Sequence, residues 1–501
     1  MDHSRKRTPK QLGHCLLTRR SFLKAASTAA LLSIPGLAAA AAVPAARRPN
    51  ILFILTDDQG PWAWGGGGHP DARTPNLDRL RAEGALLANY FVTCPVCSPA
   101  RASLISSRYP TEVGIPDYLG AAADPGLGLD PALPAWPRLL QHAGYRTALI
   151  GKWHLGDQDR YLPEHFGYEH FAGFRHGGRI SKDPDMEIGG EKRQVPGYTT
   201  DILADLALDF IQQHHDGPFL VSLHFFAPHA NVDNRTADGD RTWLPQNETD
   251  WTAFQSLDPT LPEPGHPKLD VPRAKRMTRE YLASVAGVDR NVGRILDTLE
   301  RLGLADNTIV VFTSDHGYNL AHHGIWHKGN GWWLLTDNRA PRPNLWDNSL
   351  KAPAFVRWPA AITPGSTVER TTSNLDWFPT LLAMAGVALP ADALLRGRNF
   401  LPLLKGESVP WDDDFFAQYD QWESSAGSGN LRAYRTPDWK LVRDFRNAGK
   451  DELYHLAVDP KELNNLIDSA DPNVHEQRAL LEAKLQEAMT RLQDRVYREP
   501  Q

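Results

Sequence analysis

The sequence predicts an α/β protein with a large, mostly parallel central sheet flanked by helices, followed by a smaller C-terminal α+β subdomain. Short, wholly apolar runs alternate with helical patterns through most of the 501 residues. Such runs are typical of strands that are buried on both faces. Near residue 410 the pattern changes to short strands and one final polar helix. The length is ample for a large enzyme core.

The predicted strands are apolar runs that are too short to form helices. The first comprises residues 51–56 and directly follows Pro49-Asn50. Continuous apolar stretches of this length are typical of strands inside a parallel sheet. The other runs of this kind are residues 146–150, 219–226, 308–312 and 354–356. We expect the five strands to belong to one sheet.

The segments between these strands carry helix signals. Thr74 and Pro75 form a cap followed by proline in the first turn, and Gly84 ends that helix. A longer helix has an apolar residue at every third or fourth position, which defines one buried face. Its apolar residues are Tyr281, Val285, Val288, Val292, Ile295, Leu299 and Leu302.

Two long segments lack such patterns. Residues 157–200 and 230–275 are irregular and rich in Asp, Pro, Gly and Arg. We expect them to be long surface loops that shape a substrate pocket. Beyond residue 410 we expect strands at 415–419 and 440–443 and a helix over 474–496. The chain therefore divides into an N-terminal segment (1–46), a catalytic domain (47–408) and a C-terminal subdomain (409–501).

The N-terminal segment has the features of an export signal. Arg19 and Arg20 precede Ser-Phe-Leu-Lys, an Ala-rich apolar run follows to about Val43, and small residues end it. The paired arginines resemble the twin-arginine export signal, which implies a periplasmic or secreted protein of bacterial type. A membrane anchor is the alternative, but Pro35, Gly36 and several hydroxyl residues weaken it. We expect no stable membrane insertion.

Charge and cysteine content exclude other classes of protein. The formal net charge is −6, and without the basic N-terminal segment 47 basic residues face 59 acidic ones, a net charge of −12. A folded protein with this net negative charge is a poor binder of nucleic acid, because the phosphates are also negative. Of three cysteines, Cys15 leaves with the signal, which leaves Cys94 and Cys97. The fold is therefore not built on disulfides.

Polar residues follow the first four predicted strands, where ligands bind in open α/β sheets. Asp57-Asp58 follow the first strand, Lys152 and His154 follow the second, and His229 lies just beyond the third. Asp315-His316 follow the fourth. Carboxylate oxygens from Asp57, Asp58 and Asp315 suit a hard cation, Ca²⁺ or Mg²⁺.

The segment Cys97-Ser-Pro-Ala-Arg101 adds a reactive group to this edge of the sheet. Proline is tolerated only in the first helical turn, so Pro99 places Cys97 at or just before the start of a helix. Free N–H groups and the helix dipole favour an anion there. Arg101 lies one turn further along the same face, so its guanidinium can reach back toward Cys97.

Cys97-Ser-Pro-Ala-Arg101 resembles the C-x-P-x-R signature of the type I sulfatases, in the alkaline phosphatase superfamily. The resemblance extends from about Pro49 to the C-terminal subdomain, where Leu453-Tyr-His-Leu456 and Asp459-Pro460 are similar to a common sulfatase ending. It implies an alkaline phosphatase-like fold and sulfate ester hydrolysis. It also implies that a formylglycine-generating enzyme oxidises Cys97 to Cα-formylglycine (3-oxoalanine). The family often continues Leu-Thr-Gly-Arg, whereas residues 105–108 read Ile-Ser-Ser-Arg.

The resemblance also implies roles for the residues at the strand ends. The metal, Ca²⁺ in preference to Mg²⁺, would be held by Asp57, Asp58, Asp315, His316 and the modified Cys97. Arg101 and Lys152 would steady the aldehyde hydrate. His154, His229 and Lys328 would surround the sulfate and its leaving oxygen, with His229 as proton donor, aided by Lys328. His154 would deprotonate the second hydroxyl of the hydrate. The substrate would be a sulfated small molecule or saccharide.

Other interpretations remain open. A phosphonate or phosphate ester hydrolase could use the same groups, and a sulfated-glycan binding protein could leave Cys97 unconverted. Cys94-x-x-Cys97 could be a redox pair or half of a zinc site, although neither needs Pro99 and Arg101. We expect His322, His323 and His327 to be loop or rim residues that touch substrate rather than further metal ligands. Trp332 and Trp333 could stack on a sugar ring or pack beneath a loop.

Overall fold

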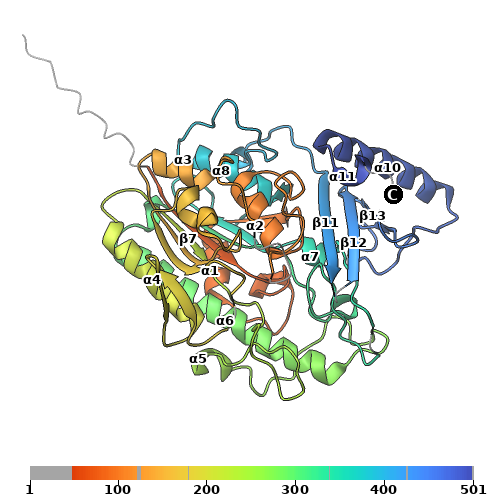
Figure 1. Ribbon diagram of the computed structural model, residues 1–501, viewed down its shortest axis with the longest axis horizontal. Coiled ribbons are helices and arrows are strands. Elements are labelled where there is room, and N and C mark those ends of the chain that lie inside the picture. The colour runs from red at the N-terminus through yellow and green to blue at the C-terminus, as the bar shows by residue number, and fades with distance from the viewer. Residues whose placement is uncertain (1–47, 121–125, 179, 338, 425–426, 499–501) are drawn as a thin grey trace, which may run out of the picture. The chain divides into compact units, whose positions relative to one another are not determined.

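The computed structural model describes residues 48–120, 126–178, 180–337, 339–424 and 427–498 (Figure 1). The predicted export signal, residues 1–46, lies outside the described residues. Among the helices described, none has both the length and the apolar character needed to cross a membrane.

A ten-stranded sheet forms the centre of the molecule. Its strand order is β10-β2-β9-β8-β1-β7-β3-β4-β5-β6. The five pairs β1–β7, β1–β8, β3–β7, β3–β4 and β2–β10 are parallel, whereas β9 runs antiparallel to both of its neighbours. The strands are β1 (Asn50–Thr56), β2 (Ala85–Phe91), β3 (Arg146–Lys152), β4 (His170–Phe174), β5 (Asp185–Ile188), β6 (Glu191–Gln194), β7 (Phe219–His224), β8 (Thr308–Ser314), β9 (Ala354–Arg357) and β10 (Ser366–Ser373).

Helices cover both faces of this sheet (Figure 1). The helices of the structure are α1 (Pro75–Glu83), α2 (Cys97–Ser106), α3 (Trp136–His142), α4 (Thr199–His214), α5 (Glu248–Trp251), α6 (Val271–Arg301), α7 (Asp347–Leu350), α8 (Trp377–Met384), α9 (Leu401–Leu404), α10 (Pro472–Leu492) and α11 (Arg495–Arg498). One face packs against α2, α3 and α8, and the other packs against α1, α4 and α6. The predicted α/β class is confirmed.

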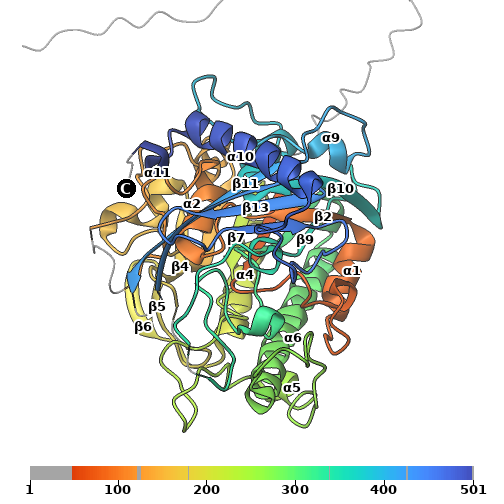
Figure 2. The ribbon, with the colours of Figure 1, turned by 90° about the vertical axis from the view of Figure 1, so that its right-hand side faces the viewer.

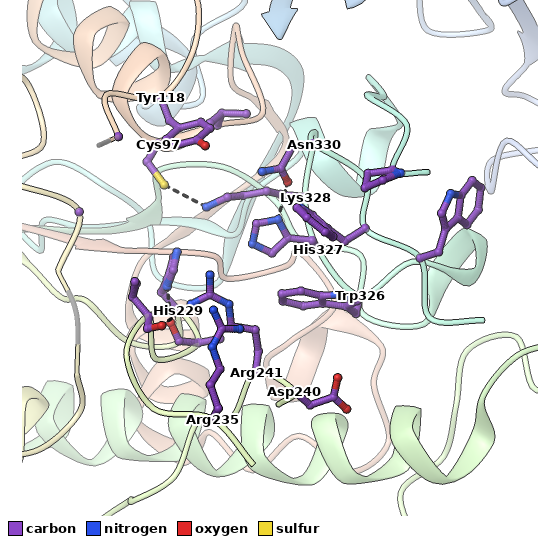
Figure 3. A pocket seen from close by; sticks show the side chains of 18 of the residues that line it. Cys97, Tyr118, His229, Arg235, Asp240, Arg241, Trp326, His327, Lys328 and Asn330 are labelled. Atoms are coloured by element: carbon purple, nitrogen blue, oxygen red, sulfur yellow. Dashed lines mark hydrogen bonds between the residues drawn. The ribbon is translucent and has the colours of Figure 1, made fainter. Parts of the chain in front are cut away.

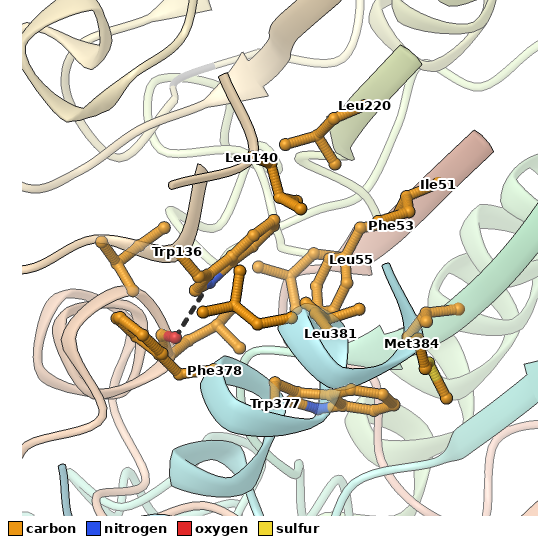
Figure 4. Packing of buried hydrophobic residues seen from close by; sticks show 14 of the residues in the cluster. Ile51, Phe53, Leu55, Trp136, Leu140, Leu220, Trp377, Phe378, Leu381 and Met384 are labelled. Atoms are coloured by element: carbon orange, nitrogen blue, oxygen red, sulfur yellow. Dashed lines mark hydrogen bonds between the residues drawn. The ribbon is translucent and has the colours of Figure 1, made fainter. Parts of the chain in front are cut away.

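Strand β1 shows why the apolar runs are continuous. Its side chains alternate between faces, so Phe53 packs with Trp136 and Trp377 on one side (Figure 4), while Leu52 and Ile54 join the opposite core. Every residue of β1 is buried. A strand that is covered on both sides is apolar along most of its length, and this is the pattern seen in residues 51–55.

The C-terminal residues form a second, antiparallel sheet in the order β11-β12-β13-β14. Its strands are β11 (Phe415–Ser424), β12 (Gly427–Arg435), β13 (Trp439–Asp444) and β14 (Glu452–His455). Helix α10 lies across one face (Figure 2), where Leu481, Leu485 and Met489 pack against Phe416 and Leu441. The other face packs against Phe91 and Val96 of the catalytic domain. The proposed division at residues 408/409 stays a prediction.

The expectation of a long loop over residues 157–200 is wrong in part. The segment contains β4, β5 and β6, which extend the central sheet at one edge. These strands have only four or five residues, and β6 is exposed at every position. Strands this short at a solvated edge carry no apolar pattern that could reveal them. Residues 230–275 are mostly irregular, as expected, apart from α5 and the first turn of α6.

Candidate active site

The carboxyl ends of adjacent strands bring the predicted residues together. Asp57 and Asp58 follow β1, Asp315 follows the neighbouring β8, and Lys152 is the last residue of β3. The turn after β1 is held by Tyr281 of α6, whose hydroxyl donates to the carbonyl of Asp58 over 2.8 Å and accepts from Gly60 N over 2.9 Å. Asp58 adopts a left-handed backbone (φ 67°) there. The turn thereby directs two consecutive carboxylates into one buried site.

Cys97 is the first residue of α2, as the position of Pro99 predicts. Its side chain is buried, and Sγ lies 3.4 Å from Asp57 Oδ1 and 3.5 Å from His316 Nε2. Lys328 Nζ donates to Sγ over 3.0 Å (Figure 3). Burial, followed by the negative charge of Asp57, raises the pKa of the Cys97 thiol to about 12. The unmodified thiol is therefore neutral at physiological pH.

Four of the predicted ligands form one compact group. The ligand atoms of Asp57, Asp58, Cys97 and His316 all lie within 4.8 Å of one another. His316 Nδ1 donates to the carbonyl of Gly317 over 2.8 Å, which leaves the Nε2 lone pair directed at the group. Asp58 Oδ2 is buried without a hydrogen-bond partner. Acidic oxygens, one free imidazole nitrogen and an unsatisfied carboxylate oxygen fit a divalent cation.

Asp315 occupies the border of this group. Its Oδ2 accepts from Arg101 Nε over 2.9 Å, and its Oδ1 lies 3.4 Å from His316 Nε2. Arg101 also donates from Nη1 to the carbonyl of Lys152 over 3.0 Å, while its Nη2 is buried without a hydrogen-bond partner and lies 3.8 Å from Asp57 Oδ2. Arg101 therefore clamps two strand ends and retains one free donor inside the site.

Two buried lysines pair with the two consecutive carboxylates. Lys152 Nζ donates to Asp57 Oδ2, and Lys328 Nζ donates to Asp58 Oδ1 over 2.6 Å. Burial opposes the charge of Lys328, but the carboxylate of Asp58 reverses that effect and raises the pKa of Lys328 well above the usual value. Burial also raises the pKa of Asp58, against the opposing charge of Lys328. Lys328 is thus a firmly protonated amine in contact with the sulfur.

Hydrogen bonds to backbone carbonyls fix the tautomers of two further histidines. His154 Nε2 donates to the carbonyl of Leu119 over 2.8 Å, which leaves Nδ1 buried without a partner. His229 Nδ1 donates to the carbonyl of Ala230 over 2.6 Å, and its Nε2 lies 3.7 Å from Asp58 Oδ2. Burial lowers the pKa of both rings, that of His229 to about 3. Both imidazoles are neutral in this structure, and each has one nitrogen free to accept a proton.

The site opens into a cavity of about 1340 Å³, larger than the usual pocket for a small ligand (about 300–1,000 Å³). Cys97, Lys152, His154, His229 and Lys328 lie on its wall. Figure 3 labels three of them, Cys97, His229 and Lys328. The rest of the wall combines indole rings with charged groups. These residues include Trp326, Trp332, Trp333, Arg235, Arg241, Arg273 and Arg339. Trp332 and Trp333 are half-buried, so part of each ring faces this space.

Only one of the three neighbouring histidines behaves as expected. His327 lines the cavity, and its potential ligand atom lies within 4.8 Å of those of Asp58 and His229. His322 packs beside Trp62, and His323 stacks on Trp346 with ring centroids 4.0 Å apart. The expectation that His322 and His323 touch substrate is wrong, because the 3-10 turn over His322–Gly324 packs both rings against other side chains and neither lines the cavity.

Several residues of the wall were missed from the sequence. Tyr118, Arg235 and Arg241 lie in irregular segments that match no motif. His224 ends β7 and contacts Lys152 O over 3.1 Å, but a single histidine at a strand end resembles any buried polar residue. The only available signal was the prediction that residues 230–275 shape the pocket, which names no individual residue.

Comparison with known proteins assigns this geometry to a family. The Sulfatase family profile matches residues 49–387, and the profile described as N-sulphoglucosamine sulphohydrolase, C-terminal, matches residues 333–493. The chain belongs to the sulfatase family and is, by that membership, a sulfuric ester hydrolase. The family implies a formylglycine and a metal, and the buried Cys97 lies inside the cluster described above.

Individual relatives extend over most of the chain. The N-acetylglucosamine-6-O-sulfatase of Bacteroides thetaiotaomicron is 30% identical and covers 85% of this chain and 84% of its own length. The steryl-sulfatase of Homo sapiens is 28% identical, with 86% of each chain covered. The solved structure of BT4656 in complex with its substrate D-glucosamine-2-N,6-O-disulfate superposes with a TM-score of 0.76 at 25% identity, and covers 90% of this chain and 99% of that one.

His323 should make the stability of the fold depend on pH. Burial, followed by the charge of His322, lowers the pKa of His323 from about 6.5 to about 3. Between these values the unfolded chain binds a proton that the folded protein does not. Stability is therefore lost as the pH falls, by up to about 1.4 kcal/mol per pH unit from this residue.

Urea unfolding at pH 7, 6 and 5 should show that the free energy of unfolding of His323→Phe depends less steeply on pH than that of the wild type. His142→Phe, at an exposed position, is the control. Parallel curves for wild type and His323→Phe would contradict this assignment.

Proposed function

We propose that this protein is an exported sulfatase that removes sulfate from a sulfated carbohydrate. It would use a formylglycine made from Cys97 and one bound Ca²⁺. The observation that carries the proposal is the position of Cys97 Sγ. It lies at the buried end of the cavity, within 3.5 Å of Asp57, His316 and Lys328. The names of the bacterial relatives and a cavity large enough for more than one sugar ring support a carbohydrate substrate.

The state of the thiol argues against the unmodified side chain as the nucleophile. With a pKa of about 12, the Cys97 side chain is a neutral thiol and a weak nucleophile. A formylglycine-generating enzyme would replace it with an aldehyde. The hydrate of that aldehyde supplies one hydroxyl for attack on sulfur and a second whose deprotonation expels sulfate. This chemistry needs a base and a proton donor close to Cys97, and the site contains candidates for both.

The roles of the surrounding side chains follow from their hydrogen bonds. His154 Nδ1 has a free lone pair because Nε2 donates to Leu119, so His154 is suited to take the proton of the second hydroxyl. Lys328 is firmly protonated, and His229 Nε2 faces the same carboxylate, Asp58. Neutral His229 holds no hydrogen on Nε2, so the proton must originate on the ammonium of Lys328. We assign delivery of that proton to the leaving oxygen to His229, which would first take it on Nε2 from Lys328 and leave Lys328 as a neutral amine.

Arg101 and Lys152 have a different role. Both are buried and bonded to carboxylates, and Arg101 Nη2 retains a free donor. They would orient the modified Cys97 and offset negative charge on the sulfuryl oxygens. Asp57, Asp58, Asp315 and His316 would hold the metal together with the modified Cys97, and a bound divalent ion would lower the pKa of the attacking hydroxyl.

Conversion of Cys97 gives the most direct prediction. In active, purified protein, mass spectrometry of the peptide that contains Cys97 should show an aldehyde or its hydrate in place of the thiol. Cys97→Ala should reduce hydrolysis of 4-nitrophenyl sulfate to background, whereas Cys94→Ala, at a buried position that no assigned step uses, should retain turnover. An intact thiol in active enzyme would refute the mechanism. Faster turnover of aryl phosphate monoesters or diesters than of aryl sulfate would favour the phosphoesterase alternative.

Calcium should bind to the acidic group and stabilise the fold. After removal of metal, Ca²⁺ at about 100 times its Kd should add about 2.7 kcal/mol to the free energy of unfolding. Calorimetry should show that Asp58→Asn weakens Ca²⁺ binding by at least about 10-fold, the loss that already follows removal of a group that only hydrogen-bonds to a metal ligand. Asp258→Asn, whose carboxylate is largely exposed and paired with Lys275, should bind as wild type does. Tighter binding of Mg²⁺ than Ca²⁺ would reverse the choice of ion.

The proposal of export concerns residues 1–46. If they form a twin-arginine signal, a bacterial cell should move this protein to the periplasm or medium and remove the segment. Arg19→Lys with Arg20→Lys should leave the precursor in the cytoplasm, whereas Arg5→Lys with Arg7→Lys should not. Cell fractionation with immunoblotting measures the distribution. An uncleaved precursor in the membrane fraction would favour the anchor instead.

A further inference from the structure

A short hairpin beyond His229 forms one wall of the cavity. Asn231 N donates to Thr242 O over 2.9 Å and Thr236 N donates to Asp240 O over 2.9 Å, so the chain reverses within this segment. An isolated antiparallel bridge pairs Arg235 with Arg241. Directly paired residues on antiparallel strands project their side chains from the same face. The hairpin therefore holds two guanidinium groups side by side.

Both arginines line the cavity, on the side where His229 lies (Figure 3). Like charges that are directly opposite on paired strands destabilise a hairpin. The pKa of Arg241 reflects this repulsion, because it is lowered first by burial and then by the positive charge of Arg235. Such a pair would be relieved by an anion bound between the two groups.

The other arginines of this wall already have carboxylate partners. Arg273 pairs with Asp240 over 2.8 Å, and Arg339 pairs with Asp337 over 2.9 Å. Within the part of the chain that the structure describes, neither Arg235 nor Arg241 forms an ion pair. Arg241 is fixed in place, because its Nη1 donates to the carbonyls of Asn231 and Val232 over 3.0 and 2.8 Å. One guanidinium is thus anchored and half-buried, and the other is exposed beside it.

We propose that Arg235 and Arg241 bind a second anionic group, a sulfate or a carboxylate, on the same saccharide whose sulfate ester reacts beside Cys97. This inference rests on the proposed function. The hairpin begins directly after His229, so the second anion would lie on the leaving-group side of the reacting ester. Paired guanidiniums favour sulfate and carboxylate oxygens because their planar donors match two acceptors at once. A substrate with one charge would leave this pair unsatisfied.

The test compares three saccharides by calorimetry on the Cys97→Ala protein, which cannot turn them over. N-acetylglucosamine 6-sulfate is the reference with one anion. D-Glucosamine-2-N,6-O-disulfate supplies a second sulfate, and a uronyl-N-acetylhexosamine 6-sulfate disaccharide supplies a carboxylate. At least one of the two dianionic ligands should bind about 10-fold or more tightly than the reference. The ligand that shows this preference identifies the second anion.

Replacement of the arginines should remove that preference. In the same background, Arg235→Gln with Arg241→Gln should reduce the affinity ratio to about threefold or less, whereas Arg235→Lys should retain part of it. Arg339→Gln, which removes a paired arginine from the same cavity, should leave the ratio unchanged. Thermal unfolding checks that each variant folds. If the double variant does not fold, Arg235→Gln alone, at an exposed position, must lower the ratio.

Failure of this inference can be told from failure of the proposed function. Equal affinity for all three ligands, or a ratio unchanged by the double substitution, would overturn the second anion site even if Cys97 is converted and aryl sulfate is hydrolysed. An unconverted, inactive Cys97 with a dianion preference that depends on the arginines would overturn the sulfatase mechanism and leave the anion site in place.

Discussion

The constraint on which the site depends is the burial of six charges at one edge of the sheet. Each buried ion costs several kcal/mol unless a partner compensates it. The carboxylates are Asp57, Asp58 and Asp315, and the cations are Arg101, Lys152 and Lys328. The two sets balance. A divalent cation added together with an ionised hydroxyl and a sulfate monoester would keep that balance. Charge neutrality thus links binding of the metal to binding of an anionic substrate.

The sequence could predict this edge because two simple rules determine it. Parallel strands end on the same side of a sheet, so Asp57 and Asp315 were expected to meet, and they lie on adjacent strands. Proline is confined to the first helical turn, so Pro99 placed Cys97 at the start of α2. Both rules act through local backbone geometry. They give the positions of side chains on elements, but not the hydrogen bonds that those side chains form.

What the sequence could not predict depends on contacts between distant segments. Which ring nitrogen of His154 is free depends on the hydrogen bond to the carbonyl of Leu119, and in His316 it depends on the carbonyl of Gly317. These hydrogen bonds can be recognised only in the folded structure. The edge strands β5 and β6 are too short and polar to carry a period-2 pattern. Arg235 and Arg241 are paired only because a hairpin brings them opposite each other. Their significance lies in the absence of an ion-pair partner among the described residues.

Reaction and recognition are therefore built on different kinds of structure. Most groups assigned to chemistry project from the ends of buried strands and from the first turns of α2, where packing on both sides of the sheet limits movement. Lys328 is an exception, because it lies in an irregular segment beyond β8. The arginine pair lies in an irregular segment, where substitutions change the shape of the cavity without disturbing the sheet. His229 belongs to both regions, because it contacts Asp58 and directly precedes the hairpin. Under the proposed function, a change of hairpin sequence would alter which saccharide is accepted, while the charge balance around Cys97 stays the same.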